Sequence, residues 1–596
     1  MLKDDPSQLD YFQLVKAAKR LDTSGCTRSI RLALLGDCAT QQLSTLLRVL
    51  FQRNGVAVDL HEAEYDTIEL EAFNPTSALH TFKADYVVLL NSSQKLSERY
   101  YDHGEVKDGF VDASADRLAA VWDAVERGGA RYIVQSTYVV PTERVFGNYD
   151  NKVPQSLYGA VQGVNAAVRE RSRERKNLLL NDVDYLASYV GKRHWCDDKL
   201  WTLAKYPCAL EHLPLLAQNI VDVVLASLGS VVKCVVMDLD NTMWGGVIGD
   251  DGLDGIRVGH LGEGEAFHSF QLYLRELKRR GVLLAVCSKN DKENALRPFR
   301  DHPDMVLRED DFAVFVANWD NKVDNLRAIQ SILNIDFSSM VFCDDNPFER
   351  SIVRRFLPTM IVPELPEDPA GYVKALTELN LFETTTHSAA DAQRTDQYRD
   401  QARRDVERLS FANVSEYLQS LEMKITLGRF DAFSLPRIAQ LIQRSNQFNL
   451  TTRRYSEPEC QAFMEDVEGS VPLWVSLKDK FGDLGLVLVA ICRVSPDELE
   501  IDSFLMSCRV LQRGVEQHAM NTIFAAAQRR GVRRVVGRYI PTAKNSMVKD
   551  FYRGFGFKSR GEDAHGASTW ELAVDDYVPA VVHMEAIEPP NNNTRV

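Results

Sequence analysis

The stretch VVMDLDNTMWGG, residues 235–246, places two carboxylates at the end of a short apolar run. The run is typical of a buried strand, and residues two apart in a strand lie on the same side. Asp238 and Asp240 would therefore emerge together where the chain turns, and they are costly there without a balancing cation. Mg²⁺ suits them, because it is a hard cation that binds oxygen ligands. The alternative is a simple strand-to-turn cap, with Asn241 and Thr242 in the turn.

Two later strands and one helix carry polar residues at comparable positions. Ser288 ends the run LLAVCS, Lys322 opens a helix, and Asp344 and Asp345 end the run MVFCDD. Open parallel sheets bind ligands at the carboxyl ends of their strands. We therefore expect one hydroxyl, one lysine and four carboxylates to converge on one edge of a sheet.

This set of residues resembles the haloacid dehalogenase superfamily of phosphotransferases. The resemblance implies that Asp238 is the nucleophile that takes up phosphoryl, that Asp240 is the general acid/base, and that Lys322 offsets charge. It also implies a phosphate site and a metal site, with the phosphate held by Asn241, Thr242 and Ser288 and Mg²⁺ held by Asp238, Asp240 (through its carbonyl), Asp344 and the adjacent Asp345. The gaps between the motifs are too short for an inserted lid, which predicts a capless, open site.

Three longer motifs narrow the resemblance to the FkbH-like branch of that superfamily: DLDNTMWGGVIGDDG (238–252), AVCSKND (285–291) and FCDDNPFER (342–350). Proteins of this branch load a glyceryl unit from 1,3-bisphosphoglycerate onto a phosphopantetheinylated acyl carrier protein, feeding polyketide or related antibiotic biosynthesis. The resemblance, which covers roughly residues 200–580, implies the same activity here, through an enzyme thioester. Two alternatives remain open: a phosphomonoesterase without acyl transfer, and a non-enzymatic module in which Asp238 is only a structural metal ligand.

Cys287 directly precedes Ser288 and is our candidate for the thiol that holds the glyceryl group. Mg²⁺ and Lys322 or Lys289 nearby would lower the pKa of a thiol and raise its thiolate fraction. The alternative is a small core residue, because free cysteines are often buried. Alternation along the strand would also point Cys287 and Ser288 to opposite faces.

The first domain alternates apolar runs with helical patterns, as expected for a parallel sheet covered by helices, with strands at 31–36, 56–60, 84–90 and 131–135. Gly36-Asp37-Cys38 resembles the first block of SGNH-type hydrolases, with Cys38 in place of the serine. No Asp-x-x-His follows to complete a triad. A nucleophile without a base favours a binding or structural role.

The last domain resembles the GNAT acyltransferase fold, in which backbone N–H groups at a helix start hold the pyrophosphate of coenzyme A. In RVLQRG, residues 509–514, Gln512 stands where the first glycine of that loop belongs. A side chain there obstructs close approach of the backbone. We therefore expect a phosphopantetheine arm near Arg509, Arg513 and Gly514; the alternative is that both arginines only pair with surface carboxylates.

These patterns predict a multidomain α/β protein, made of an SGNH- or flavodoxin-like parallel sheet, a capless Rossmann-like haloacid dehalogenase domain and a GNAT-like mixed α+β domain. Lys and Arg number 70 and Asp and Glu 84, which gives a net charge of −14 and no electrostatic reason to bind nucleic acid or an anionic membrane. Ten scattered cysteines without zinc spacing, and no spanning apolar segment, predict a reduced, cytosolic chain. The expected boundaries are 1–200, a helical connector 201–230, 231–382, a helical linker 383–422, 423–576 and a disordered tail 577–596.

Overall fold

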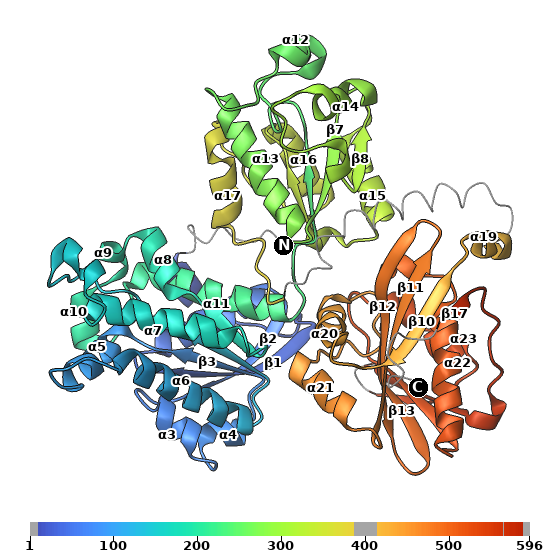
Figure 1. The fold of residues 1–596 in the computed structure, drawn as a ribbon, viewed down its shortest axis with the longest axis horizontal. Coiled ribbons are helices and arrows are strands. Elements are labelled where there is room, and N and C mark those ends of the chain that lie inside the picture. Colours follow the sequence, from blue (N-terminus) through green and yellow to red (C-terminus); the bar gives the residue numbers. More distant parts are fainter. Residues whose placement is uncertain (1–9, 387–413, 564–565, 588–596) are drawn as a thin grey trace. The chain divides into compact units, whose positions relative to one another are not determined.

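The computed structural model describes residues 10–386, 414–563 and 566–587. The chain divides into two compact units, with the division between Ala226 and Ser227 (Figure 1). The first unit contains one sheet and the second contains two. No helix in the described ranges is long and apolar enough to cross a membrane.

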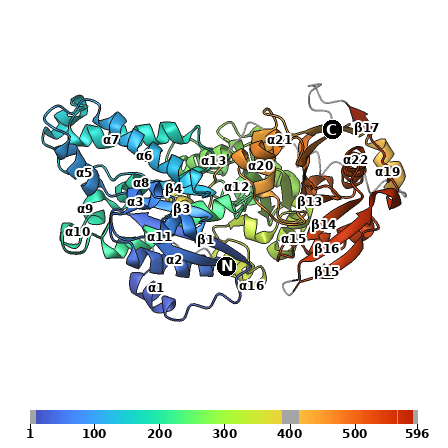
Figure 2. The ribbon, with the colours of Figure 1, turned by 90° about the horizontal axis from the view of Figure 1, so that it is seen from below.

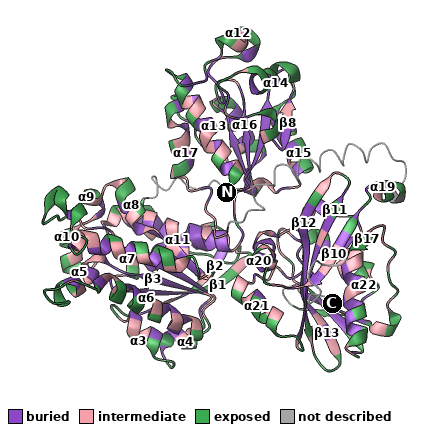
Figure 3. Ribbon diagram, viewed as in Figure 1, coloured by how far each residue is buried: buried purple, intermediate pink, exposed green. Residues whose placement is uncertain are grey.

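The first unit is built on a five-stranded parallel sheet in the order β2-β1-β3-β4-β5. Its strands are β1 (Arg28–Gly36), β2 (Val56–Glu62), β3 (Tyr86–Leu90), β4 (Tyr132–Ser136) and β5 (Leu178–Asn181). The central strands are buried along their length, as the near-continuous apolar runs predict (Figure 3). The short run LLLN of β5 was absent from our prediction.

Helices cover both faces of this sheet and gather beyond the carboxyl ends of its strands. They are α1 (Tyr11–Ala18), α2 (Gln41–Arg53), α3 (Ile68–Phe73), α4 (Ala78–Phe82), α5 (Ser93–Asp102), α6 (Phe110–Arg127), α7 (Leu157–Ser172), α8 (Val183–Val190), α9 (Lys192–Trp195), α10 (Asp198–Ala204) and α11 (Leu213–Ser227). Helices α5, α9 and α10 lie at one end of the sheet in both views (Figure 2).

The second unit begins with a four-stranded parallel sheet in the order β8-β7-β6-β9. Its elements are β6 (Cys234–Met237), α12 (Ile248–Gly255), α13 (Gly264–Arg279), β7 (Leu283–Ser288), α14 (Lys292–Asp301), β8 (Val314–Ala317), α15 (Lys322–Leu333), β9 (Met340–Cys343), α16 (Pro347–Phe356) and α17 (Tyr372–Glu378). We predicted a strand over 360–365, but only Ile361 forms a bridge, to Val341. The edge strand β8, with the sequence VFVA, was absent from our prediction.

A mixed eight-stranded sheet follows, in the order β15-β16-β14-β13-β12-β11-β10-β17. Its elements are α19 (Val414–Ser420), β10 (Lys424–Arg429), α20 (Leu435–Arg444), α21 (Glu457–Glu465), β11 (Ser470–Asp479), β12 (Gly482–Val494), β13 (Glu498–Met506), α22 (Val515–Arg529), β14 (Arg534–Tyr539), α23 (Phe551–Gly554), β15 (Lys558–Glu562), β16 (Ser568–Ala573) and β17 (Glu585–Ile587). The antiparallel run β10 to β13, followed by α22 and a parallel β13–β14 pair, agrees with the predicted GNAT-like fold.

Two predicted segments differ from the structure or lie outside it. Most of the predicted linker, residues 387–413, falls outside the described residues. The segment that we predicted as a disordered tail is placed as far as residue 587, and β17 pairs with β10 in parallel. The other end of that segment, 588–596, is not described.

Candidate phosphatase site and the family of the chain

The predicted acidic residues of the second unit meet at the carboxyl edge of its parallel sheet. Asp238 follows β6, and Asp344 and Asp345 follow the neighbouring strand β9. One carboxylate oxygen from each of the three lies within 4.8 Å of the others. Lys322, the first residue of α15, places its Nζ 2.9 Å from Asp238 and 2.5 Å from Asp344.

Burial and charge act together on these side chains. Burial raises the pKa of Asp344 to about 6, and the neighbouring Asp238 adds to the rise. Burial, followed by Asp238, also raises the pKa of Asp345. Burial alone would lower the pKa of Lys322, but Asp238 and Asp344 raise it above its ordinary value. The ammonium group therefore stays charged and stabilises carboxylates that burial would otherwise disfavour.

The three carboxylates form a donor set that fits Mg²⁺, which prefers oxygen ligands and is bound by few carboxylates. Asp238, Asp344 and Asp345 would hold the ion. Asp240, which we predicted to contribute its backbone carbonyl, has its carboxylate outside this cluster.

Three donors instead hold the Asp240 carboxylate. Trp244 Nε1 donates to Oδ1 at 3.0 Å, and the backbone N–H of Ile248 donates to the same oxygen at 2.9 Å. Asn290 Nδ2 donates to Oδ2 at 3.0 Å. Burial still raises the pKa of Asp240, although these hydrogen bonds oppose the rise. A fixed carboxyl with a raised pKa suits a proton donor and acceptor.

We did not predict the roles of Trp244 and Asn290, although both belong to the quoted motifs. Trp244 lies four residues after Asp240, and Asn290 lies two residues after Ser288. Their places within the motifs could have indicated these roles. The turn after β6 brings Trp244 back to Asp240, and the end of β7 brings Asn290 to the same carboxylate. A third residue that we missed, Arg350 on α16, donates through Nη1 to the carbonyl oxygens of Asp344 and Asp345, at 2.7 Å each.

The three residues that we predicted to bind phosphate lie in different surroundings. The Thr242 hydroxyl donates to Asp345 Oδ1 at 3.2 Å and accepts the Asp345 N–H at 3.1 Å, so it joins the strand ends of β6 and β9. Ser288 is buried at the end of β7. Asn241 has a positive φ of 55°, and its side-chain oxygen accepts the Gly246 N–H, which is the turn role that we kept as the alternative.

No separate lid covers this edge in the described stretch 234–343. Only α12 and α13 lie between β6 and β7, and only α14 and a short 3₁₀ turn lie between β7 and β8. This agrees with the capless site that we expected from the short gaps.

The family model described as "FkbH, N-terminal domain" matches residues 31–225. The crystal structure of the N-terminal part of the protein BF1531 from Bacteroides fragilis, which contains a phosphatase domain complexed with Mg, is 38% identical to this chain. The alignment covers 63% of this chain and 100% of that one, with a TM-score of 0.60.

The chain belongs to the FkbH family.

Its C-terminal part also aligns with acetyltransferases. The ribosomal-protein-S18-alanine N-acetyltransferase of Escherichia coli is 17% identical over 25% of this chain and 94% of that chain, with a TM-score of 0.20. The GNAT domain of PAT from S. lividans is 19% identical over 25% and 89%, with a TM-score of 0.21. These similarities do not extend to function. No curated protein matches the chain significantly.

Cys287 does not fit the nucleophilic role that we predicted for it in this FkbH-family chain. Its side chain is fully buried in the core beside α15, and its Sγ donates to the backbone oxygen of Lys322 at 3.8 Å. Burial raises the pKa of its thiol well above the ordinary value, and the Lys322 charge does not offset this. The alternative of a core residue, which strand alternation favoured, describes its position.

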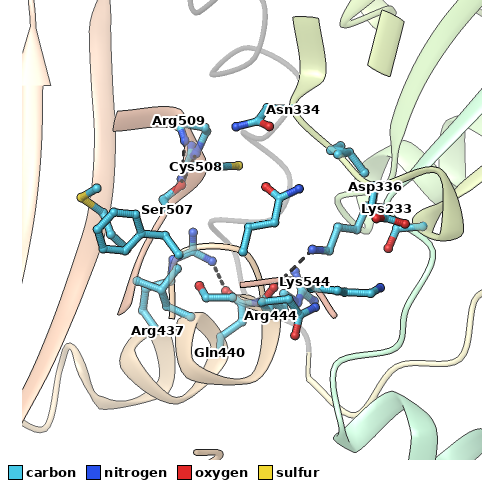
Figure 4. Close-up of a pocket in the computed structure, with 18 residues that line it drawn as sticks. Lys233, Asn334, Asp336, Arg437, Gln440, Arg444, Ser507, Cys508, Arg509 and Lys544 are labelled. Atoms are coloured by element: carbon cyan, nitrogen blue, oxygen red, sulfur yellow. Dashed lines mark hydrogen bonds between the residues drawn. The ribbon is translucent and has the colours of Figure 1, made fainter. Parts of the chain in front are cut away.

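The residues that we predicted to bind the phosphopantetheine arm of a carrier protein lie near the start of α22. Gly514, with a φ of 86°, caps the start of α22, and Gln512 has a positive φ of 61°. Arg513 is buried and pairs with Asp479 at 3.2 Å. Arg509 donates to Ser507 Oγ at 3.1 Å and lines a pocket, where Cys508 lies beside it (Figure 4). Of the two predicted arginines, Arg509 lines this pocket and Arg513 does not.

In the first unit of the FkbH-family chain, Cys38 is buried, and burial raises the pKa of its thiol well above the ordinary value.

Proposed function

We propose that this FkbH-family chain transfers a glyceryl unit from 1,3-bisphosphoglycerate, with dephosphorylation, onto the phosphopantetheine thiol of an acyl carrier protein. The observation that carries the phosphatase half is the carboxylate cluster with Lys322 inside it. The acyl-transfer half rests on the likeness of three long motifs to the FkbH-like branch.

In the phosphatase half, Asp238 is the nucleophile. One of its carboxylate oxygens attacks phosphorus, the bond to the leaving oxygen breaks, and Asp240 gives its proton to that oxygen. Asp240 then removes a proton from water, whose oxygen attacks the same phosphorus; the bond from phosphorus to the Asp238 oxygen breaks, which releases inorganic phosphate and restores the Asp238 carboxylate. Mg²⁺, when bound, would supply positive charge against the phosphate oxygens. Lys322 adds to this charge, which suits a reaction that depends on positioning and electrostatics.

In the acyl-transfer half, a thiolate attacks the carbonyl carbon of the acyl phosphate. A carbon–sulfur bond forms, and the carbon–oxygen bond breaks as phosphate leaves with the electron pair. An enzyme thioester needs an accessible thiol, and only three cysteines are partly exposed: Cys26, Cys196 and Cys508.

Cys508 is the candidate that we favour among these three. It lies in the same compact unit as the phosphatase site and borders the pocket of Figure 4. Arg437, Arg444, Arg509 and Lys544 bring positive charge to that pocket. Such charge favours a phosphate-bearing arm.

The test incubates the protein with 1,3-bisphosphoglycerate, Mg²⁺ and a panel of phosphopantetheinylated carrier proteins, and then measures intact masses. We expect a glyceryl adduct on one carrier and, without carrier, on the enzyme. Cys508→Ala should lose the enzyme adduct, whereas Cys26→Ala and Cys287→Ala should keep it. Phosphate release without any adduct would instead support the phosphomonoesterase.

A further inference from the structure

A second candidate site lies at the carboxyl edge of the sheet in the first unit. Two pockets adjoin there and share Asn91, the residue that follows β3. The larger has a volume of about 440 Å³ and the smaller about 80 Å³. All lining residues belong to the first unit, so neither pocket is part of the phosphatase site.

Asp37 at the smaller pocket has unused hydrogen-bonding capacity. It follows β1 and is 1% exposed. Its Oδ1 accepts the backbone N–H of Ser92 at 2.6 Å, but its Oδ2 is buried and makes no well-formed hydrogen bond. A buried polar atom without a partner is costly. A ligand hydroxyl that donates to Oδ2 would remove that cost.

Asn91 is held by a chain of buried side chains behind the pockets. Trp122 Nε1 donates to Gln135 Oε1 at 2.8 Å, and Gln135 Nε2 donates to Asn91 Oδ1 at 2.8 Å. Gln135 engages the oxygen of the Asn91 amide, and the Nδ2 end faces Asp37, whose carboxylate it stabilises. Nδ2 carries two hydrogens, so the second one is the donor that we assign to a ligand. Donor and acceptor therefore lie side by side, on residues that follow β3 and β1.

The smaller pocket also carries positive charge. Arg99 on α5 and Arg117 on α6 both line it. Arg117 pairs with Glu69, whereas Arg99 makes no ion pair within the described part of the chain. The start of α5, capped by Ser92, faces the same edge and adds the positive end of a helix dipole. An anionic group is favoured beside Arg99.

We propose that the two pockets form one binding site for a small hydroxylated organic anion. Its hydroxyl donates to Asp37 Oδ2 and accepts from Asn91 Nδ2, its anionic group faces Arg99, and the remainder of the molecule lies in the larger pocket. This site goes beyond the proposed transferase function and does not depend on it.

Three probes of equal carbon number test the proposal by equilibrium dialysis with the full-length protein, without Mg²⁺. Glycerate carries hydroxyls and an anion, propionate lacks the hydroxyls, and glycerol lacks the charge. We expect one glycerate to bind per chain, with at least tenfold weaker binding of the other two. Arg99→Gln should weaken glycerate binding by about tenfold or more, since a charge-assisted hydrogen bond is lost. The matched variant Arg127→Gln, at an exposed position of α6, should leave it unchanged.

Two further measurements locate the bound probe. Asp238→Asn should leave glycerate binding intact, which separates this site from the phosphatase site. Glycerate should slow hydrogen exchange in peptides at the ends of β1 and β3 in the wild-type protein, which requires no substitution. The proposal is overturned if propionate binds as tightly as glycerate, if Arg99→Gln behaves like Arg127→Gln, or if only Asp238→Asn abolishes binding.

Discussion

Asp37 after β1 and Asp238 after β6 occupy the same topological position in two parallel sheets, yet their surroundings differ. Asp238 has Lys322 at 2.9 Å and two more carboxylates from the neighbouring strand β9. Asp37 accepts the Ser92 N–H and is also stabilised by the Asn91 amide, and no acidic cluster of metal-binding geometry occurs around it in the described residues. The comparison teaches that a strand-end aspartate becomes part of a metal site only when neighbouring strands supply charge.

The largest effect is expected when the charge of Asp238, the strand-end aspartate of the metal site, is removed. Asp238→Asn should lower the rate of phosphate release by about a thousandfold or more, because the nucleophile is lost. A steady-state phosphate assay measures this. Asp116→Asn, at an exposed carboxylate of the first unit, is the control and should retain the wild-type rate. Equal rates for Asp238→Asn and the wild type would support the non-enzymatic alternative.

A second prediction concerns the ionisation of Asp37. Burial raises its pKa to about 6, against the opposing effects of Ser92 and the Arg99 charge. The folded state therefore holds the proton more tightly than the unfolded chain. The contribution of Asp37 to stability is greatest below about pH 4 and is lost as the pH rises through about 6. Because asparagine does not ionise, Asp37→Asn should remove the decrease in stability between about pH 4 and pH 6.

The expected gain for Asp37→Asn at pH 8 is up to about 3 kcal/mol, because one pKa unit corresponds to about 1.4 kcal/mol. Native-state hydrogen exchange of peptides that contain β1 and β3 measures it at pH 4 and pH 8. If wild type and variant show the same pH dependence, Asp37 is not the titrating group.

A third prediction tests the support of the metal site from α16. Arg350→Gln removes the donor to the carbonyl oxygens of Asp344 and Asp345. The Mg²⁺ concentration for half-maximal phosphate release should rise by about tenfold, as is typical when groups behind metal ligands are lost. Arg355→Gln, nearby on the same helix, serves as the matched control. An unchanged Mg²⁺ requirement would contradict the role of Arg350.

The smallest expected effect concerns the position of Asp240. Trp244→Phe removes one of its three donors while preserving an aromatic ring in the core. We expect kcat to fall by about tenfold with little change in KM, because Trp244 is fully buried and acts through its hydrogen bond to Asp240. A fall in thermal stability with an unchanged kcat would mean that Trp244 is only a packing residue.

Much of the phosphatase site could be predicted from the sequence because strand ends are local features. The apolar run before Asp238 and the one before Asp344 each define a strand, and parallel topology brings their ends together. The donors to Asp240 could not be predicted in the same way. Their positions depend on how the turn after β6 folds back, which alternation along a strand does not determine.

The role of Cys287 could not be predicted from its neighbours in the sequence. Its proximity to Ser288 in the chain suggested proximity to the reaction, but adjacent residues of a strand face opposite layers. Strands β5 and β8 were also absent from our prediction, and each lies at an edge of its sheet. Both strands depend on pairing partners that are distant in the chain.

The three residues of β17 have a consequence for solubility. They pair with the outer side of β10, which would otherwise present unpaired N–H and C=O groups at the edge of the remaining seven strands. Exposed rims of this kind recruit strands from other molecules and promote aggregation. A chain shortened to end before Glu585 should therefore self-associate through that rim, even though its catalytic residues are untouched.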